Sequence, residues 1–398
     1  LIFTTMAGLE AVAAAELREQ GLGAVAAGRG VLEARVEPSG TPERVRRLNR
    51  SLRCVQRLGV RIGRGRVGGL EDIREWARSL PYRELFEPPA TFAVRAERFG
   101  RHDFHKPDVE RAVGGAVQAS FEATGCQPPS VDLTDPDALV RVQLEDEEIL
   151  AWLDTTGYRG LHVRAYRRYA HMASMRPTVA NLLLRLGGWV GKGTLLDPFC
   201  GSGTIPIEAA TIARRIEPGS LRGEPWAWER LELFASTGAG KGDEGRASKP
   251  DESDTPGGDG SAGFRVVGIE RVSSHLQGGA ENAALAGVLD ELTLVPAKAQ
   301  DSDRILAGFG GARPVPLRVV TNPPFGRRVG FQAETRNLYR AAAGAWWRAE
   351  AERLALVAEN AALMEGALEE AGFQILERLP AAYGAISVVA LVAERGIG

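Results

Sequence analysis

The sequence of 398 residues predicts an α/β protein with two or three folded units, the last of them built on a mostly parallel sheet. Residues 177–395 repeat the order strand, glycine-rich turn and helix, which is typical of a parallel sheet with helices on both faces. Residues 1–153 alternate helical and β-like patterns in two shorter runs. The composition is 44% hydrophobic and 25% charged with three cysteines, which excludes collagen, a disordered chain and a disulfide scaffold.

The first two predicted units are small α/β units. Residues 1–60 contain a helical stretch at 8–20 and a strand-like run at 30–36. In the second unit, the helical patterns cover 70–79 and 106–122, and the β-like runs cover 91–96, 130–133 and 138–144. We expect domains at 1–60 and 61–157, a linker at 158–176 and the parallel-sheet domain at 177–398.

One segment interrupts the parallel-sheet pattern. Residues 236–263 contain eight glycines and six acidic residues but no Ile, Leu, Val, Met, Phe, Tyr or Trp. Such a segment buries too little apolar surface to offset the entropy of ordering it. We interpret it as a disordered surface insertion rather than a linker between domains, because the strand pattern resumes directly after it at 264–269.

Arginine supplies most of the positive charge, with 44 arginines against five lysines at a formal net charge of −2. Nine arginines fall between residues 44 and 66 without an acidic residue, and a second cluster at 159–176 is interleaved with aromatic side chains. Guanidinium groups bind phosphates and aromatic rings stack on bases, although a charge run is also typical of a solvated helix face. The expected RNA-binding residues are Arg53, Arg57, Arg159, Arg164, Arg167 and Arg168.

The cysteines and histidines predict neither a metal site nor disulfides. Cys54, Cys126 and Cys200 are too few and too scattered for a four-ligand zinc site, and the five histidines show no ligand spacing with them. No apolar run approaches the ~20 residues that span a bilayer. We expect a cytoplasmic monomer without metal and without membrane attachment.

The strongest motif follows the strand-like residues 193–197. Asp197 ends this strand, and the turn Gly201-Ser202-Gly203 precedes a helical stretch at 205–215. A glycine turn at a helix start lets the backbone approach a ligand closely. Dinucleotide binding is one interpretation, but the third glycine of Gly-x-Gly-x-x-Gly is missing.

Two further positions belong to the same predicted ligand site. Glu270 ends the next strand, where a carboxylate can accept hydrogen bonds from both hydroxyls of a ribose or else lie on the surface. After the third strand, Lys298 stands where proteins that the preceding motifs resemble carry a base-binding carboxylate, and Asp301 or Asp303 is a candidate substitute.

The second strong motif is Asn322-Pro323-Pro324-Phe325, after the strand-like Val319-Val320-Thr321. The amide oxygen of Asn322 and the carbonyl of Pro323 can accept both hydrogens of an exocyclic amine, which localises the nitrogen lone pair and aims it at a methyl donor. Pro323 and Pro324 fix the backbone, and Phe325 can stack on an extruded base. A Pro-Pro turn that only closes a strand is the alternative.

Covalent catalysis by a thiolate is the other mechanism that the sequence raises. Pyrimidine C5 methylation uses a cysteine nucleophile, and Cys200 is the candidate. Because Cys200 lies inside the glycine turn and no Pro-Cys pair occurs in the chain, a small semi-buried side chain is the favoured interpretation.

The string Asp-Pro-Phe-Cys-Gly-Ser-Gly-Thr resembles motif I of class I S-adenosylmethionine (SAM)-dependent methyltransferases, and the whole chain resembles THUMP-domain RNA guanine-N2 methyltransferases. Further resembling stretches lie at 4–10, 92–114, 154–157 with 164–167, 175–178 (motif X) and 223–234. The resemblance implies a ferredoxin-like domain, a THUMP module and a Rossmann-fold methyltransferase. It implies SAM binding by Arg176, Pro177, Thr178, Asp197, Phe199, Gly201, Ser202, Gly203, Thr204, Glu270, Arg271, Asp301 and Asn322.

Within this family, the chain has a single catalytic domain, and in this it resembles the enzymes that methylate guanosine 6 in the tRNA acceptor stem. We therefore expect tRNA to be the substrate. The alternatives are 23S ribosomal RNA, a DNA adenine-N6 or protein glutamine methyltransferase, which share the Asn-Pro-Pro-Phe string, and a non-catalytic RNA-binding protein. The first 170 residues and the arginine clusters favour RNA over DNA or protein, and intact motifs favour an enzyme.

Overall fold

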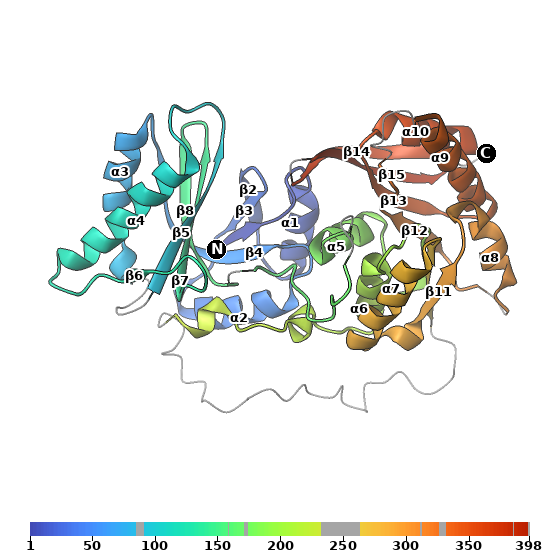
Figure 1. Cartoon of the computed structure of the whole chain (residues 1–398), viewed down its shortest axis with the longest axis horizontal. Coiled ribbons are helices and arrows are strands. Elements are labelled where there is room, and N and C mark those ends of the chain that lie inside the picture. The colour runs from blue at the N-terminus through green and yellow to red at the C-terminus, as the bar shows by residue number, and fades with distance from the viewer. Residues whose placement is uncertain are drawn as a thin grey trace. The chain divides into compact units, whose positions relative to one another are not determined.

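A computed structural model describes residues 1–84, 91–157, 159–170, 174–231, 263–310, 313–325, 332–384 and 386–396 (Figure 1). The described parts of Leu1–Thr5, Ala14–Leu161 and Glu224–Arg246 form the first of two units, and the remaining described residues form the second. Most of the predicted insertion at 236–263 lies outside the described residues, so its disorder stays a prediction.

The first unit is built on one mixed eight-stranded sheet in the order β2-β3-β1-β4-β8-β7-β5-β6. Its strands are β1 (Ile2–Thr4), β2 (Ala24–Gly28), β3 (Val31–Ala34), β4 (Arg57–Arg66), β5 (Thr91–Phe99), β6 (Ser130–Val131), β7 (Ala138–Glu145) and β8 (Glu148–Asp154). Its helical elements include α2 (Thr41–Ser51), α3 (Leu70–Arg78) and α4 (Lys106–Glu122), and α1 (Glu10–Glu19) begins in residues that belong to the second unit. Short 3-10 turns lie at Pro38–Gly40 and Tyr82–Glu84.

Strand β4 joins the two predicted N-terminal domains into this one sheet. It pairs antiparallel with β1 on one side, where Phe3 faces Leu58, and with β8 on the other, where Gly59 faces Asp154. The expected domain boundary after residue 60 therefore falls inside a strand, and the boundaries stay a prediction. Figure 1 shows α3 and α4 side by side against the sheet.

Local sequence patterns account for the helices of this unit. The helix predicted at 106–122 has the same bounds as α4, and its buried side chains recur at helical spacing, as at Val109, Val113 and Val117. The His105 backbone amide donates to Asp108 Oδ2 at 2.8 Å and so caps the helix start. The strands predicted at 91–96 and 138–144 are likewise confirmed as β5 and β7.

The second unit is built on a seven-stranded sheet in the order β11-β10-β9-β12-β13-β15-β14. Its strands are β9 (Gly193–Asp197), β10 (Phe264–Glu270), β11 (Leu292–Pro296), β12 (Leu317–Thr321), β13 (Arg353–Ala358), β14 (Phe373–Tyr383) and β15 (Ile386–Arg395). The first five in this order run parallel, and β15 is antiparallel to both of its neighbours. This is the doubly wound Rossmann-like sheet that the sequence predicts.

Helices cover both faces of this sheet. One face packs against α5 (Pro177–Leu186), α6 (Thr204–Ala213) and α7 (Ser273–Leu285), and the other packs against α8 (Ser302–Gly308), α9 (Gln332–Arg348) and α10 (Ala361–Ala371). Short 3-10 turns of this unit lie at Pro218–Leu221, Leu289–Glu291 and Ala299–Asp301, whereas the turn at Ala227–Glu229 belongs to the first unit. Every residue of the central strand β9 is buried. As expected for such a strand, its only polar residues are Thr194 and the last one, Asp197.

The strand order places the predicted motifs together. The chain leaves β9 to form β10 on one side and returns to form β12 on the other side, so β9 and β12 lie at a topological switch point. Ligands of open α/β sheets bind at the carboxyl ends of the strands at such a point. Asp197, Glu270 and Asn322 all stand at or directly after these strand ends.

Candidate active site

Asp197 connects the carboxyl ends of β9 and β12. Its side chain is 1% exposed, and Oδ1 accepts hydrogen bonds from the Thr321 hydroxyl at 2.6 Å and the Phe199 amide at 3.2 Å. Burial raises the pKa of Asp197 to about 7, with a smaller raising contribution from the charge of Glu270. The carboxylate therefore fixes the glycine turn relative to the strand that precedes the second motif. The sequence did not single out Thr321 for this contact.

The glycine turn has the backbone conformation that its residues favour. Gly201 and Gly203 have φ angles of 53° and 80°, which side chains other than glycine rarely adopt. Thr204 follows Gly203 and begins α6, so the first backbone amides of this helix face the turn. Cys200 is buried, and burial raises the pKa of its thiol well above its ordinary value, which opposes thiolate chemistry.

Glu270 ends β10, and one of its two carboxylate oxygens already accepts a hydrogen bond. Oε1 accepts from the Val272 amide at 2.9 Å, and no described residue donates a hydrogen bond to Oε2. The side chain is half-buried, so an oxygen acceptor remains at the strand end, where a ribose hydroxyl can donate to it. The neighbouring Arg271 is exposed.

The structure distinguishes the two candidate acids after β11. Asp303 Oδ2 accepts from Arg348 Nε at 2.6 Å. Burial raises the pKa of Asp303, but Arg348 and the backbone hydrogen bonds to this carboxylate together outweigh the burial and hold the pKa below its ordinary value. Asp301 is half-buried, and within the described ranges its carboxylate receives no hydrogen bond. Lys298 is exposed and begins the 3-10 turn that contains Asp301. Asp303 therefore has one carboxylate oxygen, Oδ1, without a hydrogen-bond partner among the described residues, whereas both oxygens of Asp301 are without one.

The motif X residues lie at the start of α5. Pro177 is the first residue of this helix, and the backbone amide of the exposed Arg176 donates to Tyr383 Oη at 3.1 Å. Thr178 is fully buried, and its hydroxyl has no hydrogen-bond partner among the described residues. An unpartnered buried hydroxyl is costly without a ligand. Together with the positive-φ glycine turn and the two strand-end carboxylates, these groups fit SAM, a cation with ribose, amine and carboxylate groups.

The Asn322–Phe325 loop follows β12 directly. The amide oxygen of Asn322 is buried and has no hydrogen-bond partner within the described part of the chain. Tyr339 on α9 donates its hydroxyl to the carbonyl of Pro324 at 2.6 Å, and its side chain is fully buried. No described residue donates to the carbonyl of Pro323, so both acceptors that the sequence predicts for an amine are available. Nothing in the local sequence identified Tyr339, since the contact joins residues 15 positions apart.

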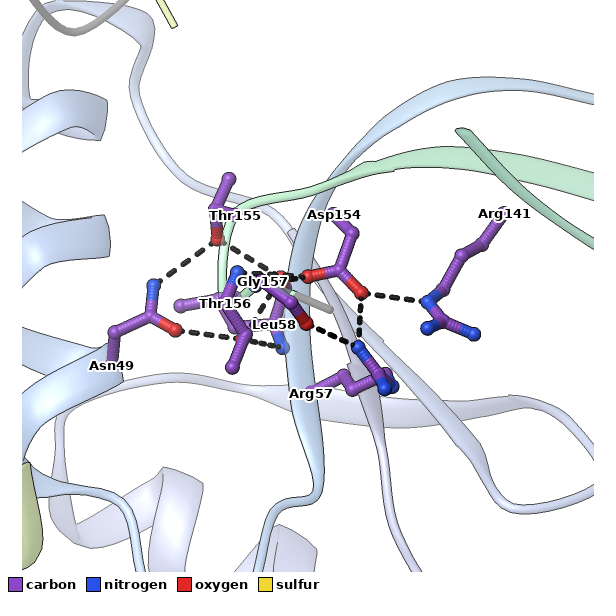
Figure 2. A network of polar contacts seen from close by, with 8 residues as sticks. All are labelled: Asn49, Arg57, Leu58, Arg141, Asp154, Thr155, Thr156 and Gly157. Atoms are coloured by element: carbon purple, nitrogen blue, oxygen red, sulfur yellow. Dashed lines mark hydrogen bonds and ion pairs between the residues drawn. The ribbon is translucent and has the colours of Figure 1, made fainter. Parts of the chain in front are cut away.

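Two of the six predicted RNA-binding arginines, the half-buried Arg57 and the buried Arg164, are ion-paired within the protein. Arg57 Nη1 lies 2.8 Å from Asp154 Oδ2 and donates to the Gly157 carbonyl at 2.6 Å (Figure 2). The Arg164 side chain is 2% exposed, and its Nε lies 3.4 Å from Glu208 Oε1. These ion pairs compete with phosphate binding, so RNA contact by Arg57 and Arg164 stays a prediction that their surroundings do not favour.

The Arg57 pair is part of a buried network in the first unit (Figure 2). Asp154 Oδ2 also accepts from Arg141 Nε at 2.6 Å, while Oδ1 accepts from the amides of Thr156 and Gly157. Burial alone raises the pKa of Asp154, but Arg57, Arg141 and the Gly157 amide outweigh it, and the pKa is lowered. Breaking such a pair leaves an uncompensated buried charge, at a cost of about 3–5 kcal/mol.

The other half of this network connects α2 to the end of β8 (Figure 2). Asn49 Nδ2 donates to Thr155 Oγ1 at 3.1 Å, and Asn49 Oδ1 accepts from Thr156 Oγ1 at 2.7 Å. Both threonines contact the backbone of Leu58 on β4. The first part of the junction-like sequence, residues 154–157, is therefore hydrogen-bonded to α2 and β4 within the first unit.

The remaining predicted RNA-binding arginines differ in accessibility. Arg53 is half-buried, and Arg159 is exposed and lies 3.3 Å from Glu224. Arg167 is half-buried and Arg168 is exposed. Among the described residues, no acidic side chain pairs with either of these two. Tyr158, one of the interleaved aromatics, lies outside the described residues.

No helix in the described ranges combines the length and apolar character needed to cross a membrane. Within the same ranges, no group of three or more His, Cys, Asp or Glu residues is arranged to hold a metal ion. The absence of metal, the monomeric state and the cytoplasmic location stay predictions.

Three family models match successive parts of the chain. The RlmL ferredoxin-like domain matches residues 1–58, the THUMP domain matches 69–153 and the RMKL-like methyltransferase domain matches 164–387. The last model alone covers more than half of the sequence. These matches agree with the order of domain types that the sequence motifs imply.

Curated relatives and a solved structure match over more than three quarters of the chain. The chain is 32% identical over 387 residues to a tRNA (guanine(6)-N2)-methyltransferase from Archaeoglobus fulgidus, a match that covers 96% of this chain and 89% of the relative. It is 28% identical over 309 residues to the enzyme of the same name from Methanocaldococcus jannaschii, covering 77% and 76%. The crystal structure of TrmN from Thermus thermophilus is 25% identical, with a TM-score of 0.68 over 99% of this chain and 98% of that one.

The matches and the site geometry agree on the class of enzyme. The carboxyl ends of β9, β10 and β12 present donors and acceptors that fit SAM, beside a loop whose Asn322 amide oxygen is buried and has no partner among the described residues. The identity to the Archaeoglobus fulgidus enzyme extends through the N-terminal domains as well as the catalytic one. The chain belongs to the THUMP-domain class I SAM-dependent RNA guanine-N2 methyltransferases.

Proposed function

We propose that this enzyme methylates N2 of guanosine 6 in the acceptor stem of tRNA, with the target base flipped into a pocket formed by Asn322, Pro323, Pro324 and Phe325. The observation that carries the pocket assignment is the buried, unpartnered amide oxygen of Asn322 at the end of β12. The tRNA assignment rests on the two relatives, both named tRNA (guanine(6)-N2)-methyltransferases.

In the proposed pocket, the protein orients a weak nucleophile. The lone pair of guanine N2 is delocalised into the ring, and the two acceptors, Asn322 Oδ1 and the Pro323 carbonyl, hold both amino hydrogens so that the lone pair points out of the base plane. Bound SAM supplies an electrophilic methyl group on a sulfonium. The new N–C bond forms as the C–S bond breaks, and N2 then loses one proton. No general base with a pKa near 7 is required in this scheme.

In the same proposal, Asp197, Glu270, Thr178, Asp301 and the glycine turn hold SAM. Glu270 accepts from the ribose, Asp301 accepts from the adenine amino group in place of the acid replaced by Lys298, and the turn surrounds the amino-acid portion. Phe199, Ser202, Thr204, Arg176 and Arg271 complete the proposed cofactor contacts. Arg53, Arg159, Arg167 and Arg168 are proposed to contact RNA phosphates.

Nucleoside analysis tests this function directly. The purified chain is incubated with labelled SAM and either unmodified tRNA or a 23S ribosomal RNA transcript, and the product is digested and mapped. We expect N2-methylguanosine at position 6 of tRNA. Methylation only of ribosomal RNA, or a methyl group on a pyrimidine carbon or a ribose oxygen, would overturn the proposal.

A further inference from the structure

The linker residues 164–170, here called the linker segment, are fixed to the methyltransferase unit at two points. Near its start, Tyr166 is fully buried and donates its hydroxyl to Glu208 Oε1 on α6 at 2.8 Å. Glu208 Oε2 also accepts from Asn181 on α5 at 2.7 Å. The first fixed point therefore connects the linker segment to both helices that begin at the cofactor site.

The second fixed point is Asn282 on α7. The Tyr169 amide donates to Asn282 Oδ1 at 3.0 Å, and Asn282 Nδ2 donates back to the Tyr169 carbonyl at 2.8 Å. The Asn282 side-chain amide thus pairs with the Tyr169 backbone through two hydrogen bonds, as two residues of neighbouring β-strands do. It requires a small residue on the helix, because a Cβ on Gly278 would lie 2.1 Å from Tyr169 Cγ.

The same Asn282 side chain reaches the cofactor turn. Its Nδ2 lies 3.3 Å from the carbonyl of Ser202, between Gly201 and Gly203, and the residue is 2% exposed. The linker also contacts this turn through Ser174, whose hydroxyl lies 3.0 Å from the Ser202 hydroxyl. Ser202 is thus contacted by a helix side chain that holds the linker segment and by the linker itself.

Arg167 and Arg168 lie between the two fixed points. Within the described residues neither has an acidic partner, and backbone hydrogen bonds from their amides to Arg164 and Tyr166 form a tight turn. RNA phosphates that hold these guanidinium groups would stabilise the segment in the conformation that Asn282 binds. A contiguous set of hydrogen bonds then joins an RNA-binding site to a cofactor-binding turn.

We propose that Asn282 is a positioning residue that couples RNA docking on the linker segment to SAM binding at the glycine turn. This inference rests on the proposed function, because it requires RNA to be the substrate. Coupling between two binding sites is reciprocal, so RNA and cofactor must each tighten the binding of the other by the same factor.

The test measures this coupling factor in the full-length chain by calorimetry. S-adenosylhomocysteine is titrated into the protein with and without saturating unmodified tRNA transcript. For the wild type we expect bound tRNA to tighten S-adenosylhomocysteine binding by about fivefold or more, the lower end of typical couplings. Asn282→Ala should weaken cofactor binding several-fold without RNA and reduce the coupling to below about twofold. Its affinity for tRNA without cofactor should stay within about twofold of wild type.

Gln277→Ala is the matched control, since it removes an exposed amide side chain from the same helix. It should retain the wild-type coupling. Ser174→Ala provides a second variant if Asn282→Ala melts at a much lower temperature, and it should also reduce the coupling. A merely structural role of Asn282 would lower stability while leaving the coupling factor intact.

The outcomes separate this inference from the proposed function. Wild-type protein that binds tRNA and cofactor without coupling, or an Asn282→Ala variant with full coupling, would overturn the inference. Unchanged cofactor affinity of Asn282→Ala without RNA would overturn it as well. A wild type that neither binds nor methylates tRNA would instead overturn the proposed substrate.

Discussion

At the scale of single residues, the amide oxygen of Asn322 is the group on which the proposed chemistry depends most. Asn322→Ala removes one of the two acceptors for the substrate amine. We expect turnover to fall by about 100-fold or more, the usual effect of removing one well-placed polar group from a transition state. Affinity for cofactor and RNA should change only a few-fold. Single-turnover methylation assays combined with calorimetry measure both quantities.

Asn337→Ala is the control for this substitution, because Asn337 carries the same amide on the exposed face of α9. It should retain turnover within about twofold. Near-normal turnover of Asn322→Ala would remove Asn322 from the mechanism and leave the Asn-Pro-Pro-Phe loop as a structural turn.

The carboxyl group of Asp197 predicts a pH-dependent stability. Its pKa is raised by burial to about 7 in the folded chain, whereas an exposed aspartate titrates near ~4. The folded state therefore retains a proton that the unfolded state has lost, and this contribution to stability declines as the pH rises from about 4 to about 7. Thermal melting of the ligand-free wild type and of Asp197→Asn at pH 6 and pH 8 measures the contribution of the Asp197 carboxyl group to the pH dependence of stability.

We expect the melting temperature of the wild type, relative to that of Asp197→Asn, to be lower at pH 8 than at pH 6. All other titrating groups are common to both proteins and cancel in the difference. A difference that stays constant between the two pH values would mean that Asp197 is ionised throughout this range.

At the scale of elements, α9 contacts the Asn322–Phe325 loop, which is proposed to hold the target base, through Tyr339. Tyr339→Phe removes the hydroxyl that donates to the Pro324 carbonyl but keeps the buried ring. We expect a loss of about 1 kcal/mol in the free energy of unfolding, typical of one hydrogen bond, and a several-fold lower kcat because the loop is less fixed. Cofactor affinity should not change. Denaturant unfolding and steady-state kinetics measure these effects.

Arg340→Ala changes a neighbouring exposed residue of α9 and serves as the control. Its kcat should remain that of the wild type. If Tyr339→Phe loses stability without any loss in kcat, the contact stabilises the fold but does not position the loop.

Elements could be predicted from the sequence where local patterns decide them. The helix at 106–122 and the strands that end at Asp197 and Glu270 follow from periodicity and from the motifs. Contacts between distant residues could not be predicted in this way. Arg57 and Asp154 are 97 positions apart, and nothing in the arginine-rich run indicates that one member is buried by an aspartate in a later strand.

At the scale of the whole molecule, the family, the cofactor and the order of domain types could be predicted because long motifs carry them. The set of RNA-binding arginines could be predicted only in part, because burial distinguishes Arg164 from Arg167 and Arg168, which are close neighbours in sequence. A cluster of arginines in the sequence forms an RNA-binding surface only when the fold leaves their guanidinium groups exposed.

The proposed RNA contact is tested most directly at Arg167 and Arg168, which pair with no acidic side chain among the described residues. Replacing both with alanine should weaken tRNA binding and reduce the slope of log affinity against log salt by up to about two, since each phosphate contact contributes ~0.9. Cofactor affinity without RNA should be retained. Binding assays at several salt concentrations test this, with Arg340→Ala/Arg378→Ala as the control that removes two ion-paired charges.

An unchanged salt slope in the Arg167→Ala/Arg168→Ala variant would exclude these side chains from phosphate contact. A control variant with an equally reduced slope would mean that the effect comes from net charge and not from the linker segment.

Strand β4 makes the ferredoxin-like and THUMP regions interdependent. It is the middle strand between β1 and β8, so a fragment cut after residue 60 would divide a strand and expose two sheet edges. Neither half is then a transplantable module. A chimaera that exchanges RNA-recognition regions between relatives should therefore keep β1, β4 and β8 from the same relative, with no junction placed inside β4.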